Sequence, residues 1–330
     1  MVSLQIARQS NARISSLPRG LVALFVGATS GIGQSTLQNF AQHAPSPRIY
    51  SVARPQTVAS HESQLAALRQ SNPTAKLNLI QADASLVSEI DKVVNEIMQK
   101  ETKLDLLVVS AGFMAFEGRK DTREGLDPSM STRYYCRQRA VQLLLPLLKN
   151  AASPRILSVL AGGLEAELNE KDLDLKNPRN WSFWNASVHA ATMHTLSLER
   201  VARENPGLSI IHWLPGPVDT AGLRRAAQFG MRPPNQMTEA EAGERGLFCA
   251  TSDRYGVRAG LVPAPEGVGP ANRSGGGIFL LGPLGESTDN EGVLATMRER
   301  GIDKVVWDFT QQVFANIAAN GSHDASKDEL

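Results

Sequence analysis

The sequence has only two cysteines, almost no net charge and no long hydrophobic run, and each of these shortages excludes a class of protein. Cys136 and Cys249 stand in no CxxC spacing and beside no paired histidine, so neither a disulfide framework nor a metal site is predicted. The 34 basic and 33 acidic residues leave a formal charge of +1, and no basic cluster predicts a nucleic-acid partner. No stretch of about 18 apolar residues is present, so no membrane span is expected.

The beginning of the chain also lacks the pattern of a secretory signal. Arg8, Arg13 and Arg19 interrupt it, and no apolar segment of a signal peptide precedes the first predicted strand. Residues 327–330 spell the ER-retention signal Lys-Asp-Glu-Leu, which acts only in the lumen, so we interpret it as a chance ending. The sequence therefore predicts a cytoplasmic protein.

What the sequence does have is an alternation of short apolar runs with longer amphipathic stretches. The runs predicted as strands are Leu21–Val26, Arg48–Ala53, Leu77–Gln81, Leu104–Val109, Arg155–Leu160, Leu208–Trp213 and Ile278–Leu281. The stretches predicted as helices are Ser35–His43, His61–Gln70, Val87–Lys100, Met130–Leu148 and Asn185–Glu204. Strands that are apolar throughout and alternate with helices indicate a parallel sheet covered on both faces. The predicted fold is α/β of the Rossmann type, a doubly wound, parallel, seven-stranded sheet with helices on both faces.

Two segments break the alternation. Residues 164–184 form an acidic loop with Pro and Trp, and residues 217–275 are long, with Gly and Pro near their end. Both follow the carboxyl end of a predicted strand, where open α/β sheets bind ligands. We therefore expect one domain over residues 1–330 with these insertions as substrate-pocket walls, the alternative being solvent-exposed decoration. Residues 321–330 are expected to form a disordered tail.

A glycine-rich turn joins the first predicted strand to the first helix. Glycines allow a tight turn and a close approach of the backbone to a pyrophosphate, and the helix N-terminus offers free N–H groups to phosphate oxygens. The residues assigned to this cradle are Gly27, Thr29, Ser30, Gly31, Ile32 and Gly33. The alternative is a structural turn without a ligand, but its position between a strand and a helix favours dinucleotide binding.

At this point the sequence resembles the short-chain dehydrogenase/reductase family, over about residues 20–220. The spacing G-x-x-x-G-x-G matches Gly27, Gly31 and Gly33, and Ser110-Ala111-Gly112 stands where the family usually has Asn-Ala-Gly. Asp83 stands where the family's Asp contacts adenine, and residues 215–220 resemble the Pro-Gly segment beside the nicotinamide. The resemblance implies further cofactor-binding residues at Asp83, Ala111, Gly112, Pro215, Gly216, Val218 and Thr220.

The end of the second predicted strand reads Val52-Ala53-Arg54 and carries no carboxylate. An acidic side chain there would bind a ribose 2′-hydroxyl and repel a 2′-phosphate, whereas Arg54 can pair a phosphate through two N–H groups. The sequence therefore favours NADP(H) as the cofactor. The alternative is an arginine that is merely solvated at the surface.

The resemblance also implies a Ser, a Tyr, a Lys and an Asn as catalytic residues, and this chain departs from the family at all four. Tyr-x-x-x-Lys occurs nowhere in it. Alignment puts Arg133 at the Asn position, Leu160 or Ala161 at the Ser position, Asn185 at the Tyr position and His189 at the Lys position.

The predicted catalytic set is therefore non-standard. Asn185 and His189 share one helix face, and His189 can act as acid or base or donate to a cofactor ribose. Arg133 can stabilise an oxyanion, and Tyr134 can supply a phenol. For His189 the alternative is a packing role, and for Arg133 an ordinary salt bridge. Trp181 and Trp184 form either an aromatic pocket wall or a hydrophobic plug.

The function these observations favour is an atypical NADP(H)-dependent oxidoreductase that acts on a carbonyl or hydroxyl of a small organic substrate. Residues 155–163, Asn185–His189 and Tyr134-Tyr135 resemble reductases of fungal natural-product pathways, which implies a polyketide- or terpenoid-like substrate. The alternatives are a non-redox isomerase or cyclase and a non-catalytic NADP(H)-binding protein. Family members often pair through the two long helices, so either a homodimer or burial of Met130–Leu148 and Asn185–Glu204 in the core is expected.

Overall fold

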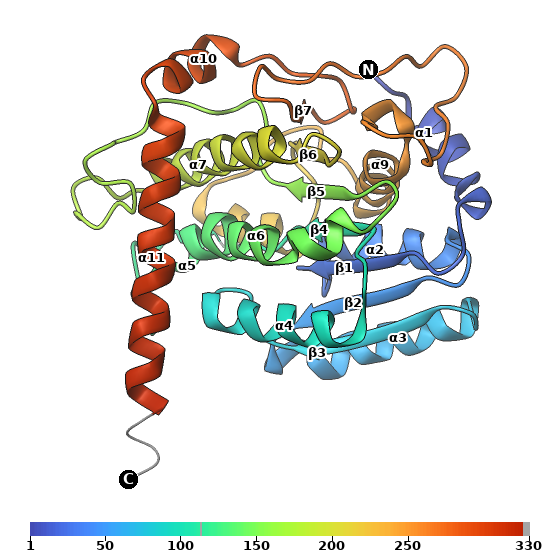
Figure 1. Cartoon of the computed structure of the whole chain (residues 1–330), viewed down its shortest axis with the longest axis horizontal. Helices are drawn as coiled ribbons and strands as arrows, with labels where there is room; N and C mark the ends of the chain where they lie inside the picture. The colour runs from blue at the N-terminus through green and yellow to red at the C-terminus, as the bar shows by residue number, and fades with distance from the viewer. Residues whose placement is uncertain (113, 326–330) are drawn as a thin grey trace.

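The computed structural model describes residues 1–112 and 114–325, and a parallel sheet runs through its centre (Figure 1). The strand order is β3-β2-β1-β4-β5-β6-β7, and every neighbouring pair is parallel. The strands are β1 Val22–Val26, β2 Arg48–Ala53, β3 Lys76–Gln81, β4 Leu106–Val109, β5 Arg155–Val159, β6 Ser209–Trp213 and β7 Phe279–Leu281. This is the doubly wound, seven-stranded architecture that the sequence predicts from mainly apolar strands alternating with helices.

Helices cover both faces of the sheet and divide the core into two clusters. On one face pack α2 Gly31–His43, α3 Val58–Ser71 and α9 Glu239–Thr251. On the other face pack α4 Val87–Lys100, α6 Cys136–Lys149 and α7 Phe183–Glu204. Shorter elements are α1 Leu4–Asn11, α5 Pro128–Met130, α8 Ala221–Ala226, α10 Glu291–Glu299, a π-helical turn Ser131–Tyr135 and 3-10 turns Ile14–Ser16, Pro55–Thr57, Ala227–Phe229 and Asp253–Tyr255. None of the described helices combines the length and apolar content needed to cross a bilayer.

Part of the insertion at 217–275 belongs to the core and not to a pocket wall. Its helix α9 packs directly against α2, and glycines make the close approach feasible. A Cβ atom on Gly243 would lie 2.0 Å from Oγ of Ser35, and one on Gly246 would lie 2.5 Å from Oγ1 of Thr36. The expectation of pocket walls therefore applies at most to the residues before and after α9.

The end of the chain is helical further than the sequence predicts. Helix α11 covers Ile302–Ala325 and so extends into the segment 321–330 that is expected to form a disordered tail. The rest of that segment lies outside the described residues. In Figure 1, α11 descends from α10 across the helices on one side of the sheet, and it contacts α7 and α4. Thr310 of α11 bonds Tyr134 inside this interface. A segment of the same chain thus covers part of the helical face that is expected to form a dimer.

Candidate functional site

The turn after β1 is tightly packed beneath the carboxyl edge of the sheet. Gly27 has a φ of +94°, and a Cβ there would lie 2.2 Å from the backbone nitrogen of Ala111. A Cβ on Gly33 would lie 2.3 Å from the carbonyl oxygen of Gly27. Only glycine satisfies both contacts, which brings the start of α2 against the loop after β4.

The N-terminus of α2 is free to receive an anion. Its N-cap residue Ser30 makes no side-chain hydrogen bond to the first turn, and the first intrahelical bond runs from Gln34 to the carbonyl of Ser30. The backbone donors of this turn therefore combine with the positive end of the helix dipole. Thr220 lies beside the same turn, with its Cγ2 3.2 Å from where a Cβ on Gly31 would be. This brings the predicted segment 215–220 to the predicted phosphate cradle.

Arg54 and Asp83 stand at the carboxyl ends of β2 and β3, which are neighbours in the sheet. Arg54 is exposed, and none of the described residues bonds its guanidinium. Asp83 accepts from the backbone N–H and the hydroxyl of Ser85 through Oδ1, and none of the described residues bonds Oδ2. The two residues therefore lie at the ends of neighbouring strands, and their roles at the adenosine end of a cofactor stay a prediction.

A buried arginine holds the loop after β4. Arg137 on α6 is 2% exposed and donates to the carbonyl of Ala111, to that of Val159 and to Oγ of Ser158. A further bond goes to the carbonyl of Thr132. Burial lowers the pKa of Arg137 to about 9, and no described carboxylate pairs with it. The ends of β4 and β5 are thus tied together by one cation.

A second buried network fixes the position where the family carries its catalytic serine. His212 Nε2 accepts from the backbone of Ala161 at 3.2 Å, and Nδ1 bonds Oγ1 of Thr195 at 2.8 Å. Thr195 donates to Glu165, which in turn accepts from Asn290. Burial lowers the pKa of His212 to about 3, so it is neutral at physiological pH. The network orients the backbone here, since Ala161 has no hydroxyl.

His189 and Asn185 are not placed as the sequence analysis expects. His189 is buried, and both ring nitrogens are used, Nδ1 by the carbonyl of Leu173 and Nε2 by the backbone N–H of Asn169. Burial lowers its pKa. It therefore anchors the insertion 164–184 and has no nitrogen left for a ribose or a substrate. Asn185 is exposed, and its amide donates to the carbonyl of Asn180.

Tyr134 is also not available as a proton donor. Its hydroxyl lies between Oγ of Ser197 and Oγ1 of Thr310 in the core, and burial raises its pKa to about 12. The chain has four tyrosines, and all are buried with the hydroxyl bonded inside the protein. In the other three, the hydroxyl of Tyr50 donates to Glu101, that of Tyr135 to Asp174 and that of Tyr255 to the carbonyl of Gly285. No phenol can therefore replace the family's tyrosine.

Arg133 instead meets a residue that the sequence analysis missed. Its Nη1 donates to Oγ of Ser187 at 2.6 Å, and its guanidinium lies 5.6 Å from the ring centre of Phe183. Burial lowers the pKa of Arg133 to about 10. Phe183 and Ser187 are four residues apart on α7, so the face that meets Arg133 lies two positions from the predicted Asn185–His189 pair. Neither a phenylalanine nor a serine at these positions indicates a functional site from the sequence alone.

Three phenylalanines from distant segments stack beside this arginine. Phe116 lies between Phe183, at 4.6 Å between ring centres, and Phe229, at 4.7 Å. Trp184 meets Phe183 edge-on at 5.1 Å. Of the two tryptophans considered as a pocket wall or a hydrophobic plug, Trp184 thus joins an aromatic cluster, whereas Trp181 packs against the core.

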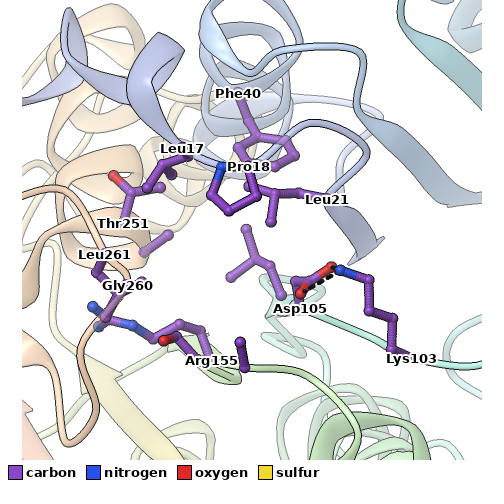
Figure 2. A pocket seen from close by; sticks show the side chains of 14 residues that line it. Leu17, Pro18, Leu21, Phe40, Lys103, Asp105, Arg155, Thr251, Gly260 and Leu261 are labelled. Carbon is purple, nitrogen blue, oxygen red and sulfur yellow. Dashed lines mark hydrogen bonds and ion pairs between the residues drawn. The ribbon is translucent and has the colours of Figure 1, made fainter.

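The cavity in Figure 2 lies at the amino-terminal edge of the sheet, opposite the carboxyl edge where the cofactor is predicted to bind. It has a volume of about 150 Å³ and lies beside Leu21, Leu106 and Arg155, at the amino ends of β1, β4 and β5. Asp105 and Lys103 pair with each other at its wall, and Arg155 donates to backbone carbonyls that include that of Tyr255. Most of its charged groups thus bond within the protein, although Nε of Arg155 has no partner among the described residues. The cavity lies at the other edge of the sheet from the residues predicted to bind the cofactor.

Comparison with known proteins identifies the family and supports the fold. The model of the family "short chain dehydrogenase" matches residues 21–229. The NmrA-like family domain-containing oxidoreductase notO of Aspergillus sp. (strain MF297-2) is 63% identical and covers 100% of both chains. Oxidoreductase AN1596 of Emericella nidulans is 38% identical, covering 95% of this chain and 98% of its own. Among solved structures, a short-chain dehydrogenase from Sphingobium yanoikuyae in complex with NADPH has a TM-score of 0.52 and 20% identity, over 69% of this chain and 84% of that one.

Proposed function

The chain belongs to the short-chain dehydrogenase family, and we propose that it is an NADP(H)-dependent oxidoreductase that interconverts a carbonyl and a hydroxyl group on a natural-product-like small molecule. The observation that carries this proposal is the combination of a free α2 N-terminus with Arg54 and no carboxylate at the end of β2. The first feature suits a pyrophosphate and the second suits a 2′-phosphate. The similar Sphingobium yanoikuyae protein holds NADPH, which supports the same choice.

The residues along the carboxyl edge fit each part of such a cofactor. Residues 27–33 would hold the pyrophosphate, and Asp83 would face the adenine. Ala111 and Gly112, positioned by Arg137, would lie along the ribose, with residues 215–220 closing the nicotinamide end. When bound, NADPH supplies the hydride.

Arg133 would be the proton donor, because the hydroxyl of every tyrosine is bonded elsewhere in the protein. Arg133 would hold the substrate oxygen through the N–H groups not used by Ser187. As the C=O double bond is reduced, the oxygen becomes an alkoxide, and a nearby guanidinium stabilises that charge. An alkoxide is a far stronger base than a guanidine with a pKa of about 10, so Arg133 can also deliver the proton and regain one from solvent.

Transfer of label tests this assignment directly. The protein would be incubated with NADPH deuterated at either face of C4 and with two diketone probes, planar acenaphthenequinone and saturated camphorquinone. We expect deuterium at the carbinol carbon of a product from one label only. Retention of both labels on the nicotinamide would overturn the redox assignment.

One observation supports a second candidate function. Since no phenol reaches the cleft, a non-redox isomerase or cyclase would need only Arg133 and the shape of the pocket. Tight NADPH binding without transfer of label to any carbonyl would favour this candidate.

A further inference from the structure

We propose that the substrate carries a planar aromatic ring next to its reacting oxygen, and that it is recognised by the aromatic cluster of Phe116, Phe183, Trp184 and Phe229 beside Arg133. The inference rests on the proposed function, since it names the substrate class of the same cleft. It also replaces the polyketide- or terpenoid-like substrate of the sequence analysis with a narrower class.

The geometry of the cluster is that of a stack. Phe116 and Phe183 are inclined by 29°, and Phe116 and Phe229 by 14°, with both ring distances below 5 Å. The guanidinium of Arg133 lies over the ring of Phe183. Flat groups at this spacing are typical of offset stacking and cation–π contact. The surface therefore selects for flat partners.

The cluster lies at the mouth of the proposed active site because of where its segments begin. Phe116 follows β4 and the cofactor-facing Ala111–Gly112. Phe183 opens α7, one turn before Ser187. Phe229 ends the short segment that begins at Thr220, beside Gly31 of the phosphate cradle. All three segments leave the carboxyl edge of the sheet, where open α/β folds bind ligands.

The rings are more exposed than a structural plug requires. Trp184 is 67% exposed and Phe229 is 51% exposed, in a chain in which aromatic residues make up only 5%. Phe116 has a ring on each of its faces, whereas Trp184 and Phe229 end the cluster and leave ring surface open to solvent. Exposed apolar groups gathered around a polar residue are typical of ligand sites.

The cation beside Phe183 adds a second requirement. Among the described residues, only Ser187 is hydrogen-bonded by Arg133, so the other N–H groups of the guanidinium have no hydrogen-bond partner there. A carbonyl oxygen conjugated to a ring carries enough negative charge to accept from them while the ring stacks. An aryl ketone, or the aryl carbinol formed from it, meets both requirements.

Binding of the same two diketones tests the proposal without turnover. Each would be titrated into the protein with and without NADP⁺, and quenching of tryptophan fluorescence would report binding. The variants are Phe229→Leu and Phe116→Leu, and the matched control is Phe309→Leu on α11, outside the cleft.

We expect acenaphthenequinone to bind about 10-fold tighter than camphorquinone, because each stacked pair adds to simple burial. Phe229→Leu removes a ring with an open face, and Phe116→Leu removes the central ring that holds Phe183 and Phe229 in the stack. Each should weaken binding of the planar probe by about 3- to 10-fold and leave binding of camphorquinone unchanged. Phe309→Leu should change neither. Equal affinity for the two probes, binding of neither, or a planar-probe affinity indifferent to both cleft variants would overturn the proposal. Transfer of label to camphorquinone with no preference for the planar probe would overturn the aromatic class and leave the proposed redox function standing.

Discussion

Arg133 and Ser187 meet across two helical segments, with Nη1 of the arginine 2.6 Å from Oγ of the serine. The π-helical turn Ser131–Tyr135 supplies the first and α7 supplies the second. This pair stands where the family's catalytic residues are missing, and it gives the cleft a cation without a tyrosine or a lysine. Under the proposed function, the reaction would depend on charge stabilisation by Arg133 and not on a phenol.

Removal of this charge should lower the rate and leave cofactor binding intact. We expect Arg133→Met to reduce kcat/KM for acenaphthenequinone by about 100- to 1000-fold, the usual cost of losing an oxyanion donor. Ser187→Ala should have a smaller effect, because Arg133 keeps its charge. The Kd for NADPH, measured in parallel, should change less than about 2-fold in both, since neither residue lies in the phosphate cradle. A full-rate Arg133→Met variant would contradict the role.

The pH profile should carry the signature of an arginine. The active form of Arg133 is protonated, and its pKa is lowered by burial to about 10. Activity that needs the proton is present below this value and is lost as the pH rises through it. Burial lowers the pKa of His189, His194 and His212, so no inflection is expected between pH 6 and 8. A rate that rises or falls tenfold in that window would point to another group.

His189 should behave as a structural residue. It makes two buried hydrogen bonds to the insertion 164–184, so His189→Ala should lower the free energy of unfolding by about 2–3 kcal/mol. Denaturant titration measures this loss. The Kd for NADPH should stay within about 2-fold of wild type, because no nitrogen of His189 faces the cofactor. Loss of NADPH binding by a folded variant would restore the role that the sequence position implies.

Arg137 should couple the sheet edge to the cofactor. Arg137→Met removes the bonds to Ala111 and Val159, and we expect about 10-fold weaker NADPH binding together with lower stability, since carbonyl groups lose their donor. Arg139→Met is the matched control two residues along the same helix, where the arginine pairs with Asp91 at the surface. Calorimetric titration should show no change for the control. Equal effects in both variants would indicate a general loss of helix α6.

Buried neutral histidines should make the fold sensitive to acid. The pKa of His212 falls to about 3 in the folded state, below its ordinary value near 6.5 in the unfolded chain. The unfolded state therefore binds the proton first, and stability is lost as the pH falls below 6.5, by about 2 kcal/mol at pH 5. Urea unfolding at pH 7.5 and pH 5 measures the loss, and His212→Gln should reduce it. An unchanged difference in the variant would contradict this assignment.

The sheet could be predicted from the sequence because its strands are short and mainly apolar, and the central strand Val22–Val26 is apolar throughout and buried on both faces. The glycine turn could be predicted for a similar reason, since the contacts of Gly27 and Gly33 allow no side chain. Helix α9 was missed because it lies within residues 217–275, which were interpreted from their length and their Gly and Pro content as an insertion.

The catalytic residues were harder to predict because the orientation of each side chain depends on hydrogen-bond partners that are distant in the chain. His189 holds the position of the family's lysine, but the insertion before α7 uses both its nitrogens. Tyr134 turns into the core because Ser197 and Thr310, 63 and 176 residues away, bond its hydroxyl. No local pattern at Ser187 shows that an arginine on another helix will reach it.

The central claim, that the cleft at the carboxyl edge of this sheet binds NADP(H), is tested most directly by titration of the purified protein with NADPH and, separately, with NADH. Cofactor fluorescence or calorimetry would follow binding in the wild type, in Arg54→Ala and in Arg19→Ala, an exposed arginine before β1 at the opposite edge. We predict tight binding of NADPH over NADH, weakened about 10-fold or more by Arg54→Ala and unchanged by Arg19→Ala. Binding of neither dinucleotide by the folded wild type would contradict the account.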